Sequence, residues 1–102
     1  MLNSNELFQL VRGWAADRNL IAGSTAVNQM LKLTEEVGEL ARAVGKQDMK
    51  EIVDGIGDCM VVLTILAAQH GCTAEGCLLE AYNTIRDRKG KMINGMFVKE
   101  AE

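Results

Sequence analysis

The sequence of 102 residues contains no proline and only four aromatic side chains. Proline breaks helix interiors, so its absence removes the strongest local obstacle to a helical chain. With few aromatics, the core has to be built from Leu, Ile, Val, Met and Ala, and abundant Ala, Leu, Glu and Lys favour helix. Apolar residues make up 48% of the chain, and no repeat or linker interrupts it. We therefore expect one all-α domain spanning residues 1–102.

Ligands for transition metals are also scarce. The chain has one histidine, His70, and three cysteines, Cys59, Cys72 and Cys77, without a CxxC spacing. The cysteines are therefore uninformative for a metal site or a disulfide, and their odd number and spacing favour reduced thiols in a cytosol. A carboxylate-bridged di-iron bundle needs Glu-x-x-His twice, so a single histidine disfavours that class as well.

Neither strong charge nor a long apolar run is present. The net charge is −3, which gives no electrostatic footprint for nucleic acid or a membrane surface. The longest apolar run, Cys59 to Ala68, is ten residues broken by Thr64, too short to span a bilayer. The N-terminus lacks the pattern of a signal peptide. We expect a cytoplasmic protein with no membrane or nucleic-acid partner.

Helical periodicity and Gly, Asn and Ser punctuation define four helical segments. We expect them over about residues 4–18, 25–44, 48–70 and 73–89. Asn3 with Glu6, and Asp48 with Glu51, form capping boxes at two of the starts. Gly45 is the expected end of the second helix.

The third segment is apolar on every side between residues 59 and 68. A helix of that kind has to be covered all round, and the other helices of so short a chain are too few to cover it. We therefore expect a four-helix-bundle-like chain that dimerises or tetramerises through its third helix. The tail, residues 90–102, contains the turn signal Asn94-Gly95 and forms either a short hairpin or an extended segment.

Acidic residues lie beside the apolar stripes of the two central helices. In the second helix the predicted stripe is Met30, Leu33, Val37, Leu40 and Val44. On a helical wheel Glu36 lies about 40° from Leu40, Glu39 lies about 60° further round, and Glu35 points most outward. In the third helix Asp54 and Asp58 are four residues apart and so share one face.

Carboxylates that face a bundle interior cost several kcal/mol each unless they are paired. Few cations are nearby in the sequence, so a divalent cation is the favoured partner over a solvated acidic face. Ligation by oxygen alone suits Mg²⁺ or Mn²⁺. A competing interpretation is a non-catalytic helical adaptor that dimerises through the apolar helix but leaves the acids unexplained.

Three stretches together carry a family resemblance. They are EEVGE at 35–39, DGIGD at 54–58 before the apolar run, and Asn83 followed by RDRK at 86–89. This arrangement resembles the MazG-like nucleoside triphosphate pyrophosphohydrolases of the all-α NTP pyrophosphatase superfamily, over about residues 8–98. The resemblance implies Mg²⁺-dependent hydrolysis of an NTP or dNTP between its α- and β-phosphates, giving a nucleoside monophosphate and pyrophosphate.

The family motif is ExxE, a spacer and ExxD. Glu36 and Glu39 match the first half, and Asp58 matches the final acid. The remaining family glutamate falls on Gly55, so we assign Asp54 to the metal instead, and we assign the nearby Glu51 to the helix cap. Adjacent to these ligands, Glu35 is a candidate general base or a residue that positions the ligands.

Substrate contacts are expected from a polar cluster near the end of the fourth helix, namely Asn83, Arg86, Arg88 and Lys89. The resemblance favours a triphosphate clamp, and the alternative is a basic helix end that complements the helix dipole. Lys32 either pairs with Glu36 one turn away or reaches a phosphate. Trp14 is expected to anchor the first helix in the core, with stacking on a base as the second possibility.

Overall fold

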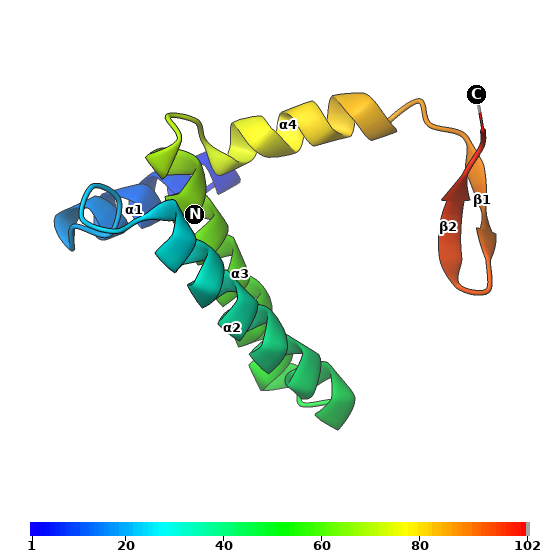
Figure 1. Ribbon diagram of the computed structural model, residues 1–102, viewed down its shortest axis with the longest axis horizontal. Helices are drawn as coiled ribbons and strands as arrows, with labels where there is room; N and C mark the ends of the chain where they lie inside the picture. Colours follow the sequence, from blue (N-terminus) through cyan, green and yellow to red (C-terminus); the bar gives the residue numbers. More distant parts are fainter. Residues whose placement is uncertain (102) are drawn as a thin grey trace.

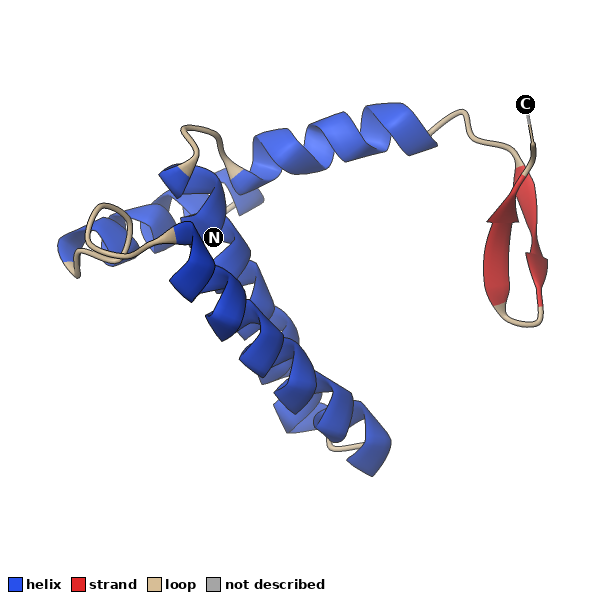
Figure 2. Cartoon of the chain, viewed as in Figure 1, coloured by secondary structure: helices blue, strands red, loops and turns tan. Residues whose placement is uncertain are grey.

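The structure is a computed structural model that describes residues 1–101. Its elements are α1 (Ser4–Asp17), α2 (Ala26–Lys46), α3 (Met49–Gln69), α4 (Ala74–Ile85), β1 (Gly90–Ile93) and β2 (Met96–Lys99). In Figure 1, α2 and α3 lie side by side as an antiparallel pair, and α4 leads away from them toward the strands. The chain is mostly helical, as predicted, with one small two-stranded sheet added (Figure 2).

Each helix begins where the sequence places a capping side chain. The side-chain oxygen of each N-cap accepts the backbone N–H three residues further on; the caps are Asn3, Thr25, Asp48 and Thr73. At α1 the capping box is reciprocal, because Asn3 Nδ2 also donates to Glu6 Oε1 at 2.7 Å. These caps satisfy N–H groups that have no partner within the helix. The predicted helix starts are confirmed.

Two predicted helix ends are wrong. α2 continues past Gly45 and ends at Lys46, and its C-cap Gln47 takes the left-handed conformation with φ of 58°. α4 stops at Ile85, four residues before the predicted end. The carbonyl of Lys89 accepts a hydrogen bond from the backbone N–H of Glu100 at 2.7 Å, so Lys89 takes part in the pairing of the C-terminal segments and not in the helix.

The C-terminal tail forms the hairpin rather than an extended segment. β1 and β2 pair antiparallel, with Met92 opposite Phe97 and Ile93 opposite Met96. Asn94 and Gly95 both have positive φ, 50° and 81°, as the primed turns of two-residue hairpins require. Within residues 1–101 the hairpin packs against none of the four helices, and all its strand residues are exposed.

The α2–α3 pair holds much of the small core, and its seam differs from the predicted stripe. The residues of α2 that turn inward are Gln29, Leu33, Glu36, Leu40 and Ala43, whereas Met30, Val37 and Val44 are about half exposed. The two helices approach closely where Leu40 meets Gly55, since a Cβ at Gly55 would lie 3.1 Å from Leu40 Cδ1. Glu36 therefore lies in the interface between α2 and α3, on the same side of α2 as Leu40.

The other apolar faces are only partly covered. On α3, Val62 and Ile65 are buried inside the chain, while Met60 and Leu63 remain about half exposed. A charge at Val62 or Ile65 would therefore disturb the fold itself rather than report on assembly alone. Helical periodicity also predicts an apolar face of Leu7, Leu10, Val11 and Trp14 on α1, but only Val11 of these is half-buried, the other three are exposed, and Ala15 is the buried residue.

α1 is joined to the start of α4 by an ion pair between Arg12 Nη1 and Glu75 Oε1 at 2.8 Å. This contact lowers the pKa of the Glu75 carboxyl, through the hydrogen bond from Arg12 first. Among residues 1–101, no helix combines the length and the apolarity needed to cross a bilayer.

Candidate functional site

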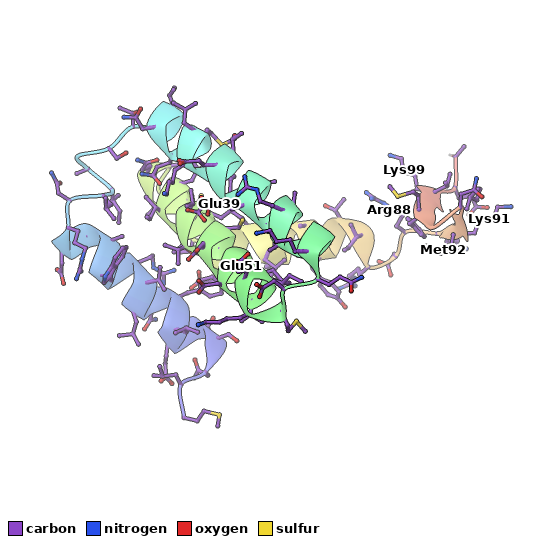
Figure 3. The ribbon with its side chains drawn as sticks, turned by 90° about the horizontal axis from the view of Figure 1, so that it is seen from below. Glu39, Glu51, Arg88, Lys91, Met92 and Lys99 are labelled. Atoms are coloured by element: carbon purple, nitrogen blue, oxygen red, sulfur yellow. The ribbon has the colours of Figure 1, made fainter. Side chains whose placement is uncertain are left out.

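Carboxylates from α2 and α3 line one cavity of about 290 Å³ at the helical pair. The acidic residues that line it are Glu39 from α2 and Glu51, Asp54 and Asp58 from α3. Figure 3 shows Glu39 and Glu51 on the two neighbouring helices, far from the labelled residues of the hairpin. The antiparallel pairing of α2 and α3 thus brings together the two acidic motifs that are separated in the sequence.

Glu36 sits in the seam between these helices with only 7% of its surface exposed. Its Oε1 lies 3.2 Å from Lys32 Nζ, so the structure realises the predicted ion pair one turn along α2. Its Oε2 is buried and has no hydrogen-bond partner among the described residues. An orphaned buried acceptor costs about 1–3 kcal/mol. A cation beside this oxygen would remove that cost.

The acids of the site repel one another. The pKa of Asp58 is raised, by partial desolvation first and then by the negative charges of Glu36 and Asp54. Desolvation of the neighbouring Cys59 thiol, followed by the charges of Glu36 and Asp58, raises the pKa of that thiol. The thiol therefore stays protonated at neutral pH. A divalent cation would offset the repulsion between these carboxylates.

The donor set fits Mg²⁺ in its chemistry. Carboxylate oxygens are the ligands that Mg²⁺ prefers, and the ion commonly keeps several waters while taking one or two carboxylates. Within residues 1–101, no three Asp, Glu, His or Cys side chains form a closed cluster able to hold an ion. The carboxylates are therefore gathered along one cavity rather than fixed around one point.

The predicted acids do not all lie where the sequence suggested. Glu36 alone points into the bundle interior, whereas Glu39, Asp54 and Asp58 are exposed at the cavity, because the groove between the helices is open there. Glu35 is exposed and does not line the cavity.

Glu51 has two contacts of interest. Its backbone N–H donates to Asp48 Oδ1 at 3.2 Å, which is one half of the predicted capping box. The other half is not formed within residues 1–101, because the backbone N–H of Asp48 donates to the carbonyl of Ala43 and the Glu51 residue lines the same cavity as Asp54. Glu51 and Asp54, the two alternatives for the metal ligand, are thus both near the candidate metal position.

Two basic residues of this cavity were not included in the predicted site. Arg42 and Lys46 line it beside Glu39. Their spacing of three and seven residues from Glu39 puts all three on one face of α2, which is a signal that the sequence did contain.

The predicted phosphate clamp lies elsewhere in the chain. Asn83, Arg88 and Lys89 line a separate cavity of about 890 Å³ beside the hairpin. The guanidinium of Arg86 donates from Nε to Asp87 Oδ2 at 3.3 Å. α4 makes no contact with α2 in the described chain, so a single chain does not bring this cluster to the acids (Figure 1).

Trp14 is not the core anchor that the sequence favoured. The residue is 45% exposed, and the guanidinium carbon of Arg18 lies 4.6 Å from the ring centroid. Arg18 also donates to the Trp14 carbonyl at 3.1 Å. Ala15 is the fully buried residue of α1, whereas the larger Trp14 beside it remains at the surface.

Comparison with known proteins gives a family match. A family model described as the MazG nucleotide pyrophosphohydrolase domain matches residues 25–92, which include α2, α3 and α4. An uncharacterized 18.2 kDa protein in the rep-hol intergenic region of Haemophilus phage HP1 (strain HP1c1) is 46% identical over 70 residues. The match covers 69% of this chain and 43% of that relative, so this chain spans less than half of the relative's length. No solved structure matches the chain significantly.

Proposed function

This chain belongs to the MazG nucleotide pyrophosphohydrolase family, and we propose that it hydrolyses nucleoside or deoxynucleoside triphosphates between the α- and β-phosphates. The products are a nucleoside monophosphate and pyrophosphate, Mg²⁺ is the cofactor, and Mn²⁺ can substitute for it. The observation that carries the proposal is the half-paired, buried Glu36 beside a cavity lined by four further carboxylates. The proposed role is house-cleaning of the nucleotide pool in the cytoplasm, that is, the removal of unwanted nucleotides from it.

The metal ligands in this proposal are Glu36, Glu39, Asp54 and Asp58. When bound, Mg²⁺ supplies positive charge that offsets the charge of the phosphate oxygens. The buried Oε2 of Glu36 would gain the partner that it lacks, and the charges of Glu36 and Asp54, which after desolvation raise the pKa of Asp58, would be offset. The acidic cavity then becomes able to accept a polyanion.

Hydrolysis needs a proton acceptor and an oriented triphosphate. The oxygen of an attacking water bonds to the α-phosphorus, the bond to the bridging oxygen breaks, and pyrophosphate leaves with that electron pair. A carboxylate of the α2 motif takes the proton of the water, and Glu35 is our candidate because the other two acids hold metal. Lys32, Arg42 and Lys46 lie on the same helix and supply positive charge for the phosphates.

The direct test is product analysis. We expect the protein, incubated with Mg²⁺ and a panel of natural and modified triphosphates, to release pyrophosphate and the matching monophosphate. Glu39→Gln, which keeps the size of the side chain, should release neither. Products consisting of a diphosphate and inorganic phosphate would place the cleavage at another bond and overturn the proposal.

A second candidate is a non-catalytic helical adaptor that assembles through apolar surfaces. The exposed side chains of Met60 and Leu63 on α3, and of Leu7 and Leu10 on α1, favour it. Calorimetric titration with Mg²⁺ separates the two functions. Binding that is lost in Glu36→Gln supports the enzyme, whereas an adaptor has no carboxylate-dependent binding of Mg²⁺.

A further inference from the structure

Two thiol groups meet at the corner between α3 and α4, which comprises residues 70–77. Cys72 and Cys77 have their sulfur atoms 3.7 Å apart, within hydrogen-bonding distance, and both residues are exposed free cysteines. Within residues 1–101 no third metal-ligating side chain joins them in a cluster able to hold an ion. Neither cysteine lines the acidic cavity, so the function proposed above leaves this pair of thiols unused.

The backbone around the two thiols is fixed by the end of one helix and the start of the next. α3 ends in a Schellman motif, in which Gly71 has a φ of 74° and the backbone N–H of Cys72 donates back to the last turn of α3 at 3.0 Å. Thr73 then caps α4, because its Oγ1 accepts the N–H of Gly76 at 3.0 Å. Cys72 thus lies one residue before the N-cap and Cys77 four residues after it. Side chains at these two positions meet in a hydrophobic staple, so the local fold itself keeps the thiols in contact.

α4 depends on this corner for its position. Glu75 lies between the two cysteines in the sequence, and its Oε1 accepts from Arg12 Nη1 of α1 at 2.8 Å. Within the described chain α4 contacts only α1 and α3, and none of its residues is buried. The corner therefore sets the direction in which α4 leaves the helical pair (Figure 1). A covalent bond between the two sulfurs would restrain that joint.

The hydrogen bonds of the sulfurs give the two thiols different roles. Cys72 Sγ donates to the carbonyl of Ala67 at 3.3 Å, so its lone pairs are free to accept the S–H of Cys77. This hydrogen bond to Cys72, followed by desolvation, raises the pKa of the Cys77 thiol. Cys77 therefore keeps its proton, and Cys72 is the sulfur that reacts first with an oxidant.

The surroundings of the pair favour a small, neutral oxidant. Both cysteines line a cavity of about 570 Å³ whose other walls are apolar apart from His70. Apolar walls do not compensate the loss of water from a charged reactant. Hydrogen peroxide carries no charge and is small enough to reach both sulfurs.

We propose that Cys72 and Cys77 form a reversible disulfide within one chain when the protein meets a hydroperoxide, and that this bond restrains the α3–α4 corner. With hydrogen peroxide, the Cys72 sulfur attacks one oxygen, the O–O bond breaks, and water leaves with the thiol proton. The Cys77 sulfur then attacks the sulfur of the resulting sulfenic acid, the S–O bond breaks, and a second water leaves with the Cys77 proton. The two sulfurs together lose two electrons, which the peroxide gains.

The movement that the bond requires is small. A disulfide holds its sulfurs at about 2.05 Å, so the two atoms have to approach by about 1.7 Å from the 3.7 Å of the reduced pair. Rotation of the two exposed side chains, with a small shift of the first turn of α4, supplies an approach of this size. The third cysteine, Cys59, is half-buried on α3, more than two helical turns before the corner. It serves as an internal reference.

The bond is tested by mass and by thiol count after treatment of the 102-residue chain with hydrogen peroxide. We expect the wild type to lose two hydrogen atoms and two of its three free thiols, with peptides that join Cys72 to Cys77, and we expect dithiothreitol to restore both thiols. Cys59→Ser is the matched control and should form the same bond. A bond that includes Cys59, a bond between two chains, or oxygen adducts in place of a disulfide overturns the proposal.

The order of attack is tested by removing one thiol at a time. In Cys77→Ser the sulfenic acid of Cys72 has no partner thiol, so it should accumulate and react with dimedone. In Cys72→Ser the remaining Cys77 should be labelled at least about tenfold more slowly, because its thiol stays protonated. Equal rates of labelling at the two sulfurs overturn the assigned order.

The effect on the corner is measured by amide hydrogen exchange. Exchange of the α4 amides should slow by at least about tenfold in the oxidised wild type, because the bond ties α4 to the end of α3 and opposes local opening. Peroxide-treated Cys77→Ser is the comparison and should show no slowing. Unchanged exchange in the oxidised wild type overturns the restraint of the corner. None of these measurements needs turnover, so they decide the disulfide whether or not the protein hydrolyses a triphosphate.

Discussion

The ammonium group of Lys32 lies 3.2 Å from one oxygen of Glu36, while the other oxygen of Glu36 is buried without a partner among the described residues. The carboxylate is therefore only half satisfied by its own chain. The ion pair also raises the pKa of Lys32, through its hydrogen bond to Glu36 first. Since a raised pKa keeps Lys32 charged throughout the neutral range, the site keeps one cation in place there before any metal binds.

Removing that cation should make the fold depend more strongly on the metal. In Lys32→Met the Glu36 carboxylate loses its partner, so we expect a lower melting temperature without metal and a larger upward shift on adding Mg²⁺ than in wild type. Thermal unfolding followed by circular dichroism, with and without Mg²⁺, measures both. Lys50→Met, at an exposed position of α3, is the control. Equal Mg²⁺ shifts in the two variants would contradict a metal at Glu36.

The two acids of the first motif should be needed for turnover and not for folding. Glu36→Gln and Glu39→Gln keep the shape of the side chain and remove its charge, so we expect pyrophosphate release to fall by at least about a hundredfold with the helical signal unchanged. Loss of the helical signal in either variant would instead show that the acid is structural.

The second motif contains two candidate ligands, and mutation should rank them. Asp54→Asn should weaken Mg²⁺ binding and cut turnover by orders of magnitude, because Asp54 contributes to the repulsion at Asp58 and lines the acidic cavity. Glu51→Gln should keep most of the activity, since its backbone N–H still donates to the Asp48 cap. The opposite ranking, measured by calorimetry and turnover together, would assign the ligand to Glu51.

The raised pKa of Asp58 predicts a dependence on pH with a definite sign. A carboxyl whose pKa is higher in the folded state stabilises the fold below its ordinary value of 3.8, and this stability is lost as the pH rises through the raised value. At pH 7 the ionised group therefore destabilises the metal-free protein. Asp58→Asn should raise the melting temperature at pH 7. This gain should shrink as the pH falls toward the pKa that the carboxyl has in the unfolded chain.

The same titration governs the metal. In wild type, Mg²⁺ should bind more tightly as the pH rises through the raised pKa of Asp58, with release of a proton measured in weakly buffered solution. Asp58→Asn should bind Mg²⁺ weakly at every pH in that window. A melting temperature at pH 7 that is lower in Asp58→Asn than in wild type would show that the charge is compensated in some other way.

The sequence alone determined the local structure of this protein. The four helix starts and the Asn94-Gly95 turn depend on contacts within a few residues, such as the Asn3 side chain on the N–H of Glu6. Such contacts are available to the chain before any tertiary packing forms, so a sequence pattern suffices to find them. The acidic motifs were found in the same way, because their spacing fixes the helix face on which they lie.

Only the tertiary structure decided how those faces meet. The ion pair of Arg12 with Glu75 joins residues 63 apart, and no sequence pattern marks it. The stripe around Val37 and the seam around Glu36 differ by one position, about 100° on the wheel, and both satisfy helical periodicity. Leu40 approaches Gly55 closely in the arrangement that has Glu36 in the seam. The helix α4 ends before the basic residues 86–89, which lie away from the acids. Packing between distant residues sets these outcomes, so periodicity along one helix does not determine them.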